Sequence, residues 1–173
     1  KLNDESIACF KSKRLILTNS TSINTLEVFS SSIQHLHIGE SEDFAKLIND
    51  GQGVLLQHLH SLTLEFLPVV KLEGIGHIPT VRIVGCNKLK TVKGLGSNRY
   101  VELDNCYSLE DVSSLASVPI VTIENCRSVT KTSYECLKNV PRLKVLRTGG
   151  EVEIYNEEDE EDEEEYDEYD DEV

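Results

Sequence analysis

The hexapeptide VRIVGC at residues 81–86 recurs as VELDNC at 101–106 and as VTIENC at 121–126. In each copy, one apolar residue stands on each side of a single spacer residue, and the copy ends on a cysteine. The copies lie twenty residues apart. A fixed period of this size predicts a solenoid, in which each turn buries its apolar side only by stacking on its neighbours.

The repeat continues beyond the cysteine in steps of three residues. The apolar positions that follow are Leu89, Leu109 and Val129, then Val92 and Val112, then Leu95 and Leu115. The apolar-x-apolar part has the period of two that is typical of a strand. The rest of each turn is too short for a long helix, so we expect tight turns or short 3₁₀ segments there.

Written out, one turn resembles the leucine-rich repeat family, whose motif is L-x-x-L-x-L-x-x-N/C-x-L. The stretch DVSSL at 111–115 also resembles the D-V-S-x-L phrase of short cysteine-type repeat arrays. The resemblance covers about 61–148 and, in weaker form, 14–41. It implies a right-handed coil with a parallel sheet on its concave face and short turns on its convex face. Val and Ile often replace Leu, and the repeat lengths are uneven.

Extending the register in both directions predicts about seven coils, and so a mostly β solenoid of the α/β class, expected to be a fragment of a longer array. The strands are expected to begin near Leu15, Leu36, Leu62, Val81, Val101, Val121 and Leu143. The longest gap, of 26 residues, holds a predicted helix that Ser41 caps and that buries Phe44, Leu47 and Ile48. A second short helix is expected at 132–139, which makes one or two helices in all.

Charge divides the chain into two parts. Residues 151–173 hold sixteen of the 31 acidic side chains and no Lys or Arg, which leaves residues 1–150 with fifteen acids against seventeen bases, a net charge of +2. We therefore predict a near-neutral solenoid over 1–155 and a disordered acidic tail over 156–173. No run of eighteen apolar residues occurs, so no membrane partner is expected.

The acidic tail has two interpretations. It is either a solubilising end or a segment that captures basic proteins, such as histone-like or ribosomal proteins. In layout alone the chain is similar to the acidic leucine-rich nuclear phosphoproteins. We also expect the tail to fold back on a basic C-terminal end made of Lys138, Arg142, Lys144 and Arg147.

The cysteines favour a structural role. Cys86, Cys106 and Cys126 are expected to form a column at the corner after each strand, where a thiol packs and donates to a loop carbonyl of the next coil. A linear column does not provide the convergent geometry of a zinc site. An unpaired ladder also favours a reducing compartment, so we predict an intracellular protein of the cytoplasm or nucleus.

The histidines are candidates for a metal or pH-sensing site. His35 and His37 flank one strand position, while His58 and His60 repeat the spacing before the next strand. The second pair is expected out of register with the first, so no metal site is predicted. No catalytic motif or phosphate-cradling glycine motif occurs, so we expect neither enzymatic activity nor a cofactor.

The spacer positions of the strands therefore carry the predicted function. Twelve of these face residues are predicted to contact a partner: His35, His37, Thr63, Glu65, Arg82, Tyr100, Glu102, Asp104, Thr122, Glu124, Arg142 and Lys144. Glu65, Glu102, Asp104 and Glu124 would make an acidic zone, and Tyr100 is the best aromatic anchor.

We expect a monomeric, non-catalytic module that binds a protein, and not nucleic acid, across its concave face. The alternatives are a tail that binds basic proteins, and a substrate-recognition arm of a ubiquitin-ligase adaptor.

Overall fold

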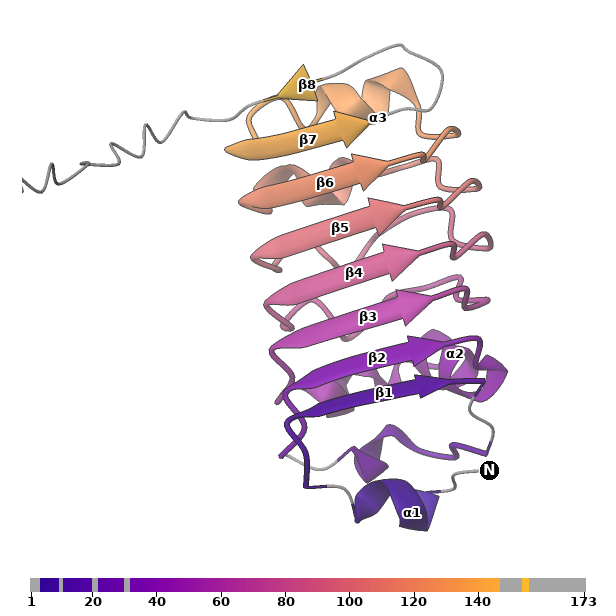
Figure 1. Cartoon of the computed structure of the whole chain (residues 1–173). Coiled ribbons are helices and arrows are strands. Elements are labelled where there is room, and N and C mark those ends of the chain that lie inside the picture. Colours follow the sequence, from indigo (N-terminus) through magenta and orange to yellow (C-terminus); the bar gives the residue numbers. More distant parts are fainter. Residues whose placement is uncertain (1–3, 10, 20–21, 30–31, 147–153, 156–173) are drawn as a thin grey trace, which may run out of the picture.

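The computed structural model describes residues 4–9, 11–19, 22–29, 32–146 and 154–155. Seven strands pair side by side in chain order to form a parallel sheet, and an eighth, short strand pairs antiparallel with the last of them (Figure 1). The strands are β1 (Arg14–Thr18), β2 (His35–Gly39), β3 (Ser61–Glu65), β4 (Thr80–Val84), β5 (Tyr100–Asp104), β6 (Ile120–Glu124), β7 (Arg142–Leu146) and β8 (Ile154–Tyr155). Each parallel strand begins one residue before the predicted apolar position, and the predicted spacing is confirmed.

The alternation of apolar and polar residues determines which side of each strand is buried. In β5, Val101 and Leu103 are buried while Tyr100, Glu102 and Asp104 are half-buried. The same two positions are buried in all seven parallel strands, and they join one continuous hydrophobic core. Because the side-chain period of a strand is two, one face of the sheet meets the core and the other stays open.

The connections between strands lie behind the sheet, on its core side (Figure 1). They contain η1 (Leu26–Val28), α2 (Glu42–Asn49), η2 (Gln52–Leu56), η3 (Ser113–Ser117) and α3 (Lys131–Glu135), where η denotes a 3₁₀ helix, while α1 (Asp4–Ala8) precedes β1. The helices in the connections are short, because few residues remain between one strand and the next.

The helix predicted after Ser41 is confirmed as α2. The Ser41 hydroxyl accepts a hydrogen bond from the Phe44 backbone N–H at 3.2 Å, and Phe44, Leu47 and Ile48 are buried. The range predicted for the second helix, 132–139, was wrong. The side chain of Thr130 caps α3, so this helix begins at Lys131 and ends at Glu135.

Two elements were not predicted. Helix α1 raises the number of α-helices to three in the described residues, where one or two were expected. Strand β8 runs antiparallel to β7, with Lys144 opposite Tyr155 and Val145 opposite Ile154. A parallel strand needs a crossover of a dozen or more residues. Only the seven residues 147–153 separate β7 from β8, so the chain can pair there only by turning back.

The residue after each of the strands β1 to β6 turns the chain through a left-handed conformation. These residues are Asn19, Glu40, Phe66, Gly85, Asn105 and Asn125, with φ between 51° and 63°. Asn and Gly adopt this conformation at low cost, whereas a bulky side chain rarely does. Glu40 and Phe66 are therefore the exceptions in the series, and Phe66 has the bulkier side chain.

Among the described residues, no helix is both long and apolar enough to span a membrane. The acidic segment 156–173 and Arg147 lie outside those residues.

Candidate functional site

The open face of the sheet gathers side chains from all seven parallel strands into three columns. The central column contains Ile16, His37, Thr63, Arg82, Glu102, Thr122 and Lys144. The column at the start of the strands contains Arg14, His35, Ser61, Thr80, Tyr100, Ile120 and Arg142. The column at their end contains Thr18, Gly39, Glu65, Val84, Asp104, Glu124 and Leu146. All twelve predicted contact residues therefore belong to one face.

Charged side chains in the middle and last strands form pairs across neighbouring strands. Arg82 Nε lies 2.7 Å from Glu102 Oε1, and the Tyr100 hydroxyl donates to Glu102 Oε2 at 3.2 Å. Lys144 Nζ lies 3.5 Å from Glu124 Oε1. This part of the face is therefore polar and largely balanced in charge.

The four acids of the predicted acidic zone lie on this face, and each has a polar or charged partner. Glu65 lies 2.8 Å from His37 Nε2, and Asp104 accepts a hydrogen bond from Asn125 Nδ2 at 3.2 Å. Together with the pairs of Glu102 and Glu124, each of the four acids has a partner. The strand register brings the acids onto one face, but their partners on neighbouring strands determine how much negative charge that face presents.

Tyr100, the predicted aromatic anchor, is half-buried and held in place. Burial raises the pKa of its hydroxyl, and the charge of Glu102 raises it further, while a hydrogen bond with Thr122 opposes the shift. The phenol is therefore neutral near pH 7 and donates to Glu102.

The predicted basic end is not a free cluster of cations either. Lys144 is paired with Glu124, and Lys138 and Arg142 each interact with another group of the protein.

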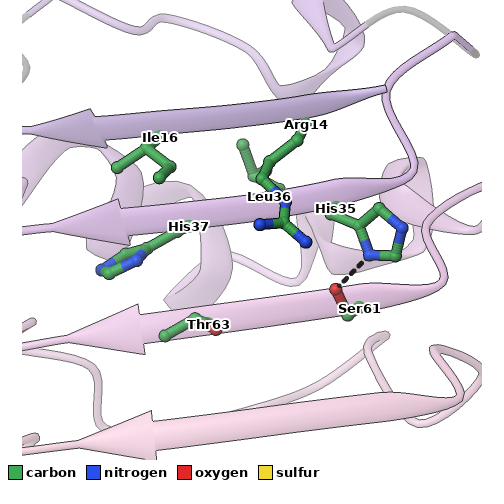
Figure 2. Close-up of a pocket in the computed structure, with 7 residues that line it drawn as sticks. All are labelled: Arg14, Ile16, His35, Leu36, His37, Ser61 and Thr63. Atoms are coloured by element: carbon green, nitrogen blue, oxygen red, sulfur yellow. Dashed lines mark hydrogen bonds between the residues drawn. The ribbon is translucent and has the colours of Figure 1, made fainter. Parts of the chain in front are cut away.

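A hollow of about 200 Å³ opens on the same face over β1, β2 and β3. It is lined by Arg14, Ile16, His35, Leu36, His37, Ser61 and Thr63. Figure 2 shows the Arg14 side chain reaching across β2, with its guanidinium between the two imidazoles in this view. Nδ1 of His35 lies 2.8 Å from Ser61 Oγ. Arg14, Ile16 and Ser61 were not among the predicted contact residues, although their register with His35 and His37 follows from the strand spacing.

The two residues of the second histidine pair, His58 and His60, lie in different surroundings. The His60 ring centroid lies 6.3 Å from that of His35, near the hollow. His58 is half-buried, and burial lowers its pKa, with a further contribution from His77. Within the described ranges, no group of three or more His, Cys, Asp or Glu side chains is arranged to hold a metal ion.

The three repeat cysteines are fully buried at equivalent corners. Their Sγ atoms lie 3.8 Å from the carbonyl oxygens of Leu64, Ile83 and Leu103, respectively. These acceptors belong to the preceding strand, so the expected contact with the next coil was wrong. Burial raises the pKa of Cys86 to about 12, which keeps its thiol protonated.

A second hollow, of about 520 Å³, lies at the corner beyond the ends of β1 to β4, and Phe66, Pro68, Glu40 and Lys88 are among the residues that line it. The Phe66 side chain is 54% exposed. Sequence periodicity does not mark this residue, because Phe66 stands where most of the other turns have Asn or Gly.

A scan against protein-family models finds no matching family, and a search of curated proteins finds no matching relative.

Proposed function

We propose that this chain is a leucine-rich repeat solenoid that acts as a non-catalytic protein-binding module, with its partner lying across the open face of the sheet. The repeat of apolar positions at 81–126 and the unbroken register of the seven parallel strands support the solenoid.

The observation that carries the binding role is the face itself. Three columns of side chains from seven strands lie in register on the side opposite the connections. A broad, rigid sheet of this kind offers polar groups at fixed spacing, and its cross-strand pairs hold the side chains in defined positions. Such preorganisation lowers the entropy cost of binding a partner.

A matched pair of variants tests the role. Arg82→Glu reverses a charge on the open face and places it beside Glu102. Lys90→Glu makes the same change on a connection, beside Glu110, which lies 3.1 Å from Lys90 Nζ. Partners are identified by quantitative affinity capture with the full chain, and each purified partner is then titrated against both variants.

We expect Arg82→Glu to weaken partner binding at least tenfold, on the order of 1.4 kcal/mol. Lys90→Glu should change it less than twofold. Equal losses for the two variants, or a loss with Lys90→Glu alone, would contradict binding across the open face.

A second candidate function concerns the segment 156–173, because its fourteen acidic residues favour attraction of a basic protein. Its test replaces the nine acidic residues at 157–165 by their amides in the full chain. Loss of all basic partners from this variant, with Arg82→Glu having no effect, would favour the tail over the sheet face.

A further inference from the structure

The hollow over β1, β2 and β3 differs from the rest of the open face in its charge. Within the described residues, Arg14 is in no ion pair, whereas Arg82 and Lys144 each pair with a carboxylate. Lys11 and Lys13, which lead into β1, are also exposed. The first edge of the sheet therefore presents three cationic side chains, and the one acid in the face columns of β1 to β3, Glu65, is paired with His37.

The groups around the hollow are suited to a carboxylate. The Arg14 guanidinium offers planar pairs of N–H donors, which match the two oxygens of a carboxylate. The contact between His35 Nδ1 and Ser61 Oγ fixes that ring and leaves its Nε2 for a ligand. Thr63 adds a hydroxyl on the next strand (Figure 2). The exposed aliphatic side chain of Ile16 forms an apolar side of the same hollow.

We propose that this hollow is a binding site for peptide carboxylates, and that the acidic segment 156–173 of this chain occupies it. Charge complementarity supports the assignment, because 156–173 has fourteen acids and no Lys or Arg. The basic end beside β7 is a weaker site for the same segment, since Lys144 is paired with Glu124.

The chain is long enough for the segment to reach the hollow. The last described residue is Tyr155 in β8, which pairs with β7. From β7 to β2 there are five strand spacings, or roughly 24 Å at about 4.8 Å each. The eighteen residues 156–173 span up to about 60 Å when extended. Tethering also gives the segment a local concentration on the order of millimolar, so a weak site is occupied.

Occupation of the hollow makes the acidic segment a competitor of any partner that binds there, an inference that rests on the proposed function. A partner that binds across the open face near β1 to β3 must displace the segment. The test below uses the chain alone, so its failure leaves the proposed protein-binding role untouched.

The experiment compares amide and imidazole NMR signals in four full-length chains. These are the unmodified chain, the chain with amides at the nine acidic positions of 157–165, Arg14→Gln, and the control Arg99→Gln. Arg99 is also an exposed arginine at the start of a strand, but it immediately precedes β5, four strands away from β1.

Tail neutralisation should shift the signals of Ile16, His35, His37, Ser61 and Thr63, and Arg14→Gln should reproduce those shifts. Arg99→Gln should leave them as in the unmodified chain. Raising sodium chloride from about 50 mM to about 500 mM should move the unmodified chain towards the neutralised one, because salt screens exposed charges. A free peptide of 156–173 added to the neutralised chain should bind at least about threefold more weakly after Arg14→Gln.

Identical signals at the hollow with and without the acidic side chains would overturn the proposal. Shifts confined to Lys138, Arg142 and Lys144 would also overturn it, by moving the site to the other end of the sheet. Shifts that fade on tenfold dilution would show that the segment comes from a second copy of the chain, and would overturn occupation within one chain.

Discussion

The first three strands and the next three share one register but differ in the length and the residues of their turns. From β4 to β6 the turns are twenty residues long, with a buried cysteine at each corner and Gly or Asn in the left-handed position. From β1 to β3 the spacing is uneven, α2 and η2 fill the longest connection, and Glu40 and Phe66 take the left-handed position.

The difference between these regions extends to their surfaces. On the regular part, charged groups of neighbouring strands pair with one another, as Arg82 does with Glu102. On the irregular part lie the hollow beside Arg14 and the exposed ring of Phe66. Repetition therefore stabilises the scaffold, and departures from it provide the features that distinguish one end from the other.

The largest contrast expected is in thiol reactivity. Cys9 and Cys136 are exposed, whereas Cys86, Cys106 and Cys126 are buried. Because the pKa of Cys86 is raised to about 12, its thiolate is scarce at pH 8, and alkylation should be at least about a thousandfold slower than at Cys9. Mass spectrometry after timed iodoacetamide treatment measures the rates. In denaturant all five should react alike, and rapid native labelling of the column would refute its burial.

The next largest effect concerns whether the two regions unfold together. Leu103 is fully buried in the regular part, and Leu103→Ala should lower the free energy of unfolding by about 2–5 kcal/mol, through lost burial and a residual cavity. Because one core joins all seven parallel strands, we expect a single transition. Urea unfolding followed by circular dichroism and by tyrosine fluorescence checks this. Two separated transitions would show that the regions are independent.

A smaller effect tests the boundary between the regions. A Cβ atom at Gly85 would lie 2.3 Å from Cδ1 of Phe66, so Gly85→Asn should cost about 1 kcal/mol through crowding. The double variant Gly85→Asn with Phe66→Asn should recover most of that loss, because Asn105 and Asn125 occupy these positions in the regular turns. Thermal unfolding of all four chains measures the coupling. Simple additivity of the two changes would contradict the proposed contact.

A pH-dependent effect of similar or smaller size is expected in the turn after β5. Hydrogen bonds from the Ser113 hydroxyl and backbone N–H lower the pKa of Asp111, and Ser133 lowers it further. Because the pKa of Asp111 is lower in the folded than in the unfolded chain, its ionised carboxylate stabilises the folded protein. This stabilisation is fully present above the unfolded pKa of about 4 and is lost as the pH falls through the folded pKa.

Asp111→Asn should therefore cost up to about 1 kcal/mol at pH 7 and progressively less below pH about 4. Urea unfolding at several pH values checks it. Thr91, whose Oγ1 accepts from the Lys93 N–H at 3.1 Å, is the equivalent residue one turn earlier. The control Thr91→Val should show no such pH dependence, and a pH-independent loss in Asp111→Asn would contradict the assignment.

The smallest effect is expected at the ion pairs of the regular face. Arg82→Gln should change the free energy of unfolding by less than about 0.5 kcal/mol, because the pair is partly exposed to water. Chemical unfolding at low and high salt measures it. A loss above about 2 kcal/mol would show that the face pairs are part of the scaffold, and binding losses in face variants would then need a stability correction.

Most of the sheet was predictable from particular residues. Leu62, Val81 and Val101 mark their strands because alternate side chains must face the core. Ser41 marks the start of α2 because an unpaired N–H needs a cap. The hollow and the pairing of the acids were not predictable, since they depend on which rotamers meet across neighbouring strands. Strand β8 was missed because two residues carry no periodic signal.

The apolar pattern alone is enough to predict the number, order and register of the parallel strands, because each turn must bury its own two apolar residues against the turns beside it. Where charge remains unpaired on the open face follows only from the folded arrangement of the strands. That outcome depends on distances between side chains some twenty residues apart in sequence, such as Arg82 and Glu102, which become neighbours only when the strands are stacked.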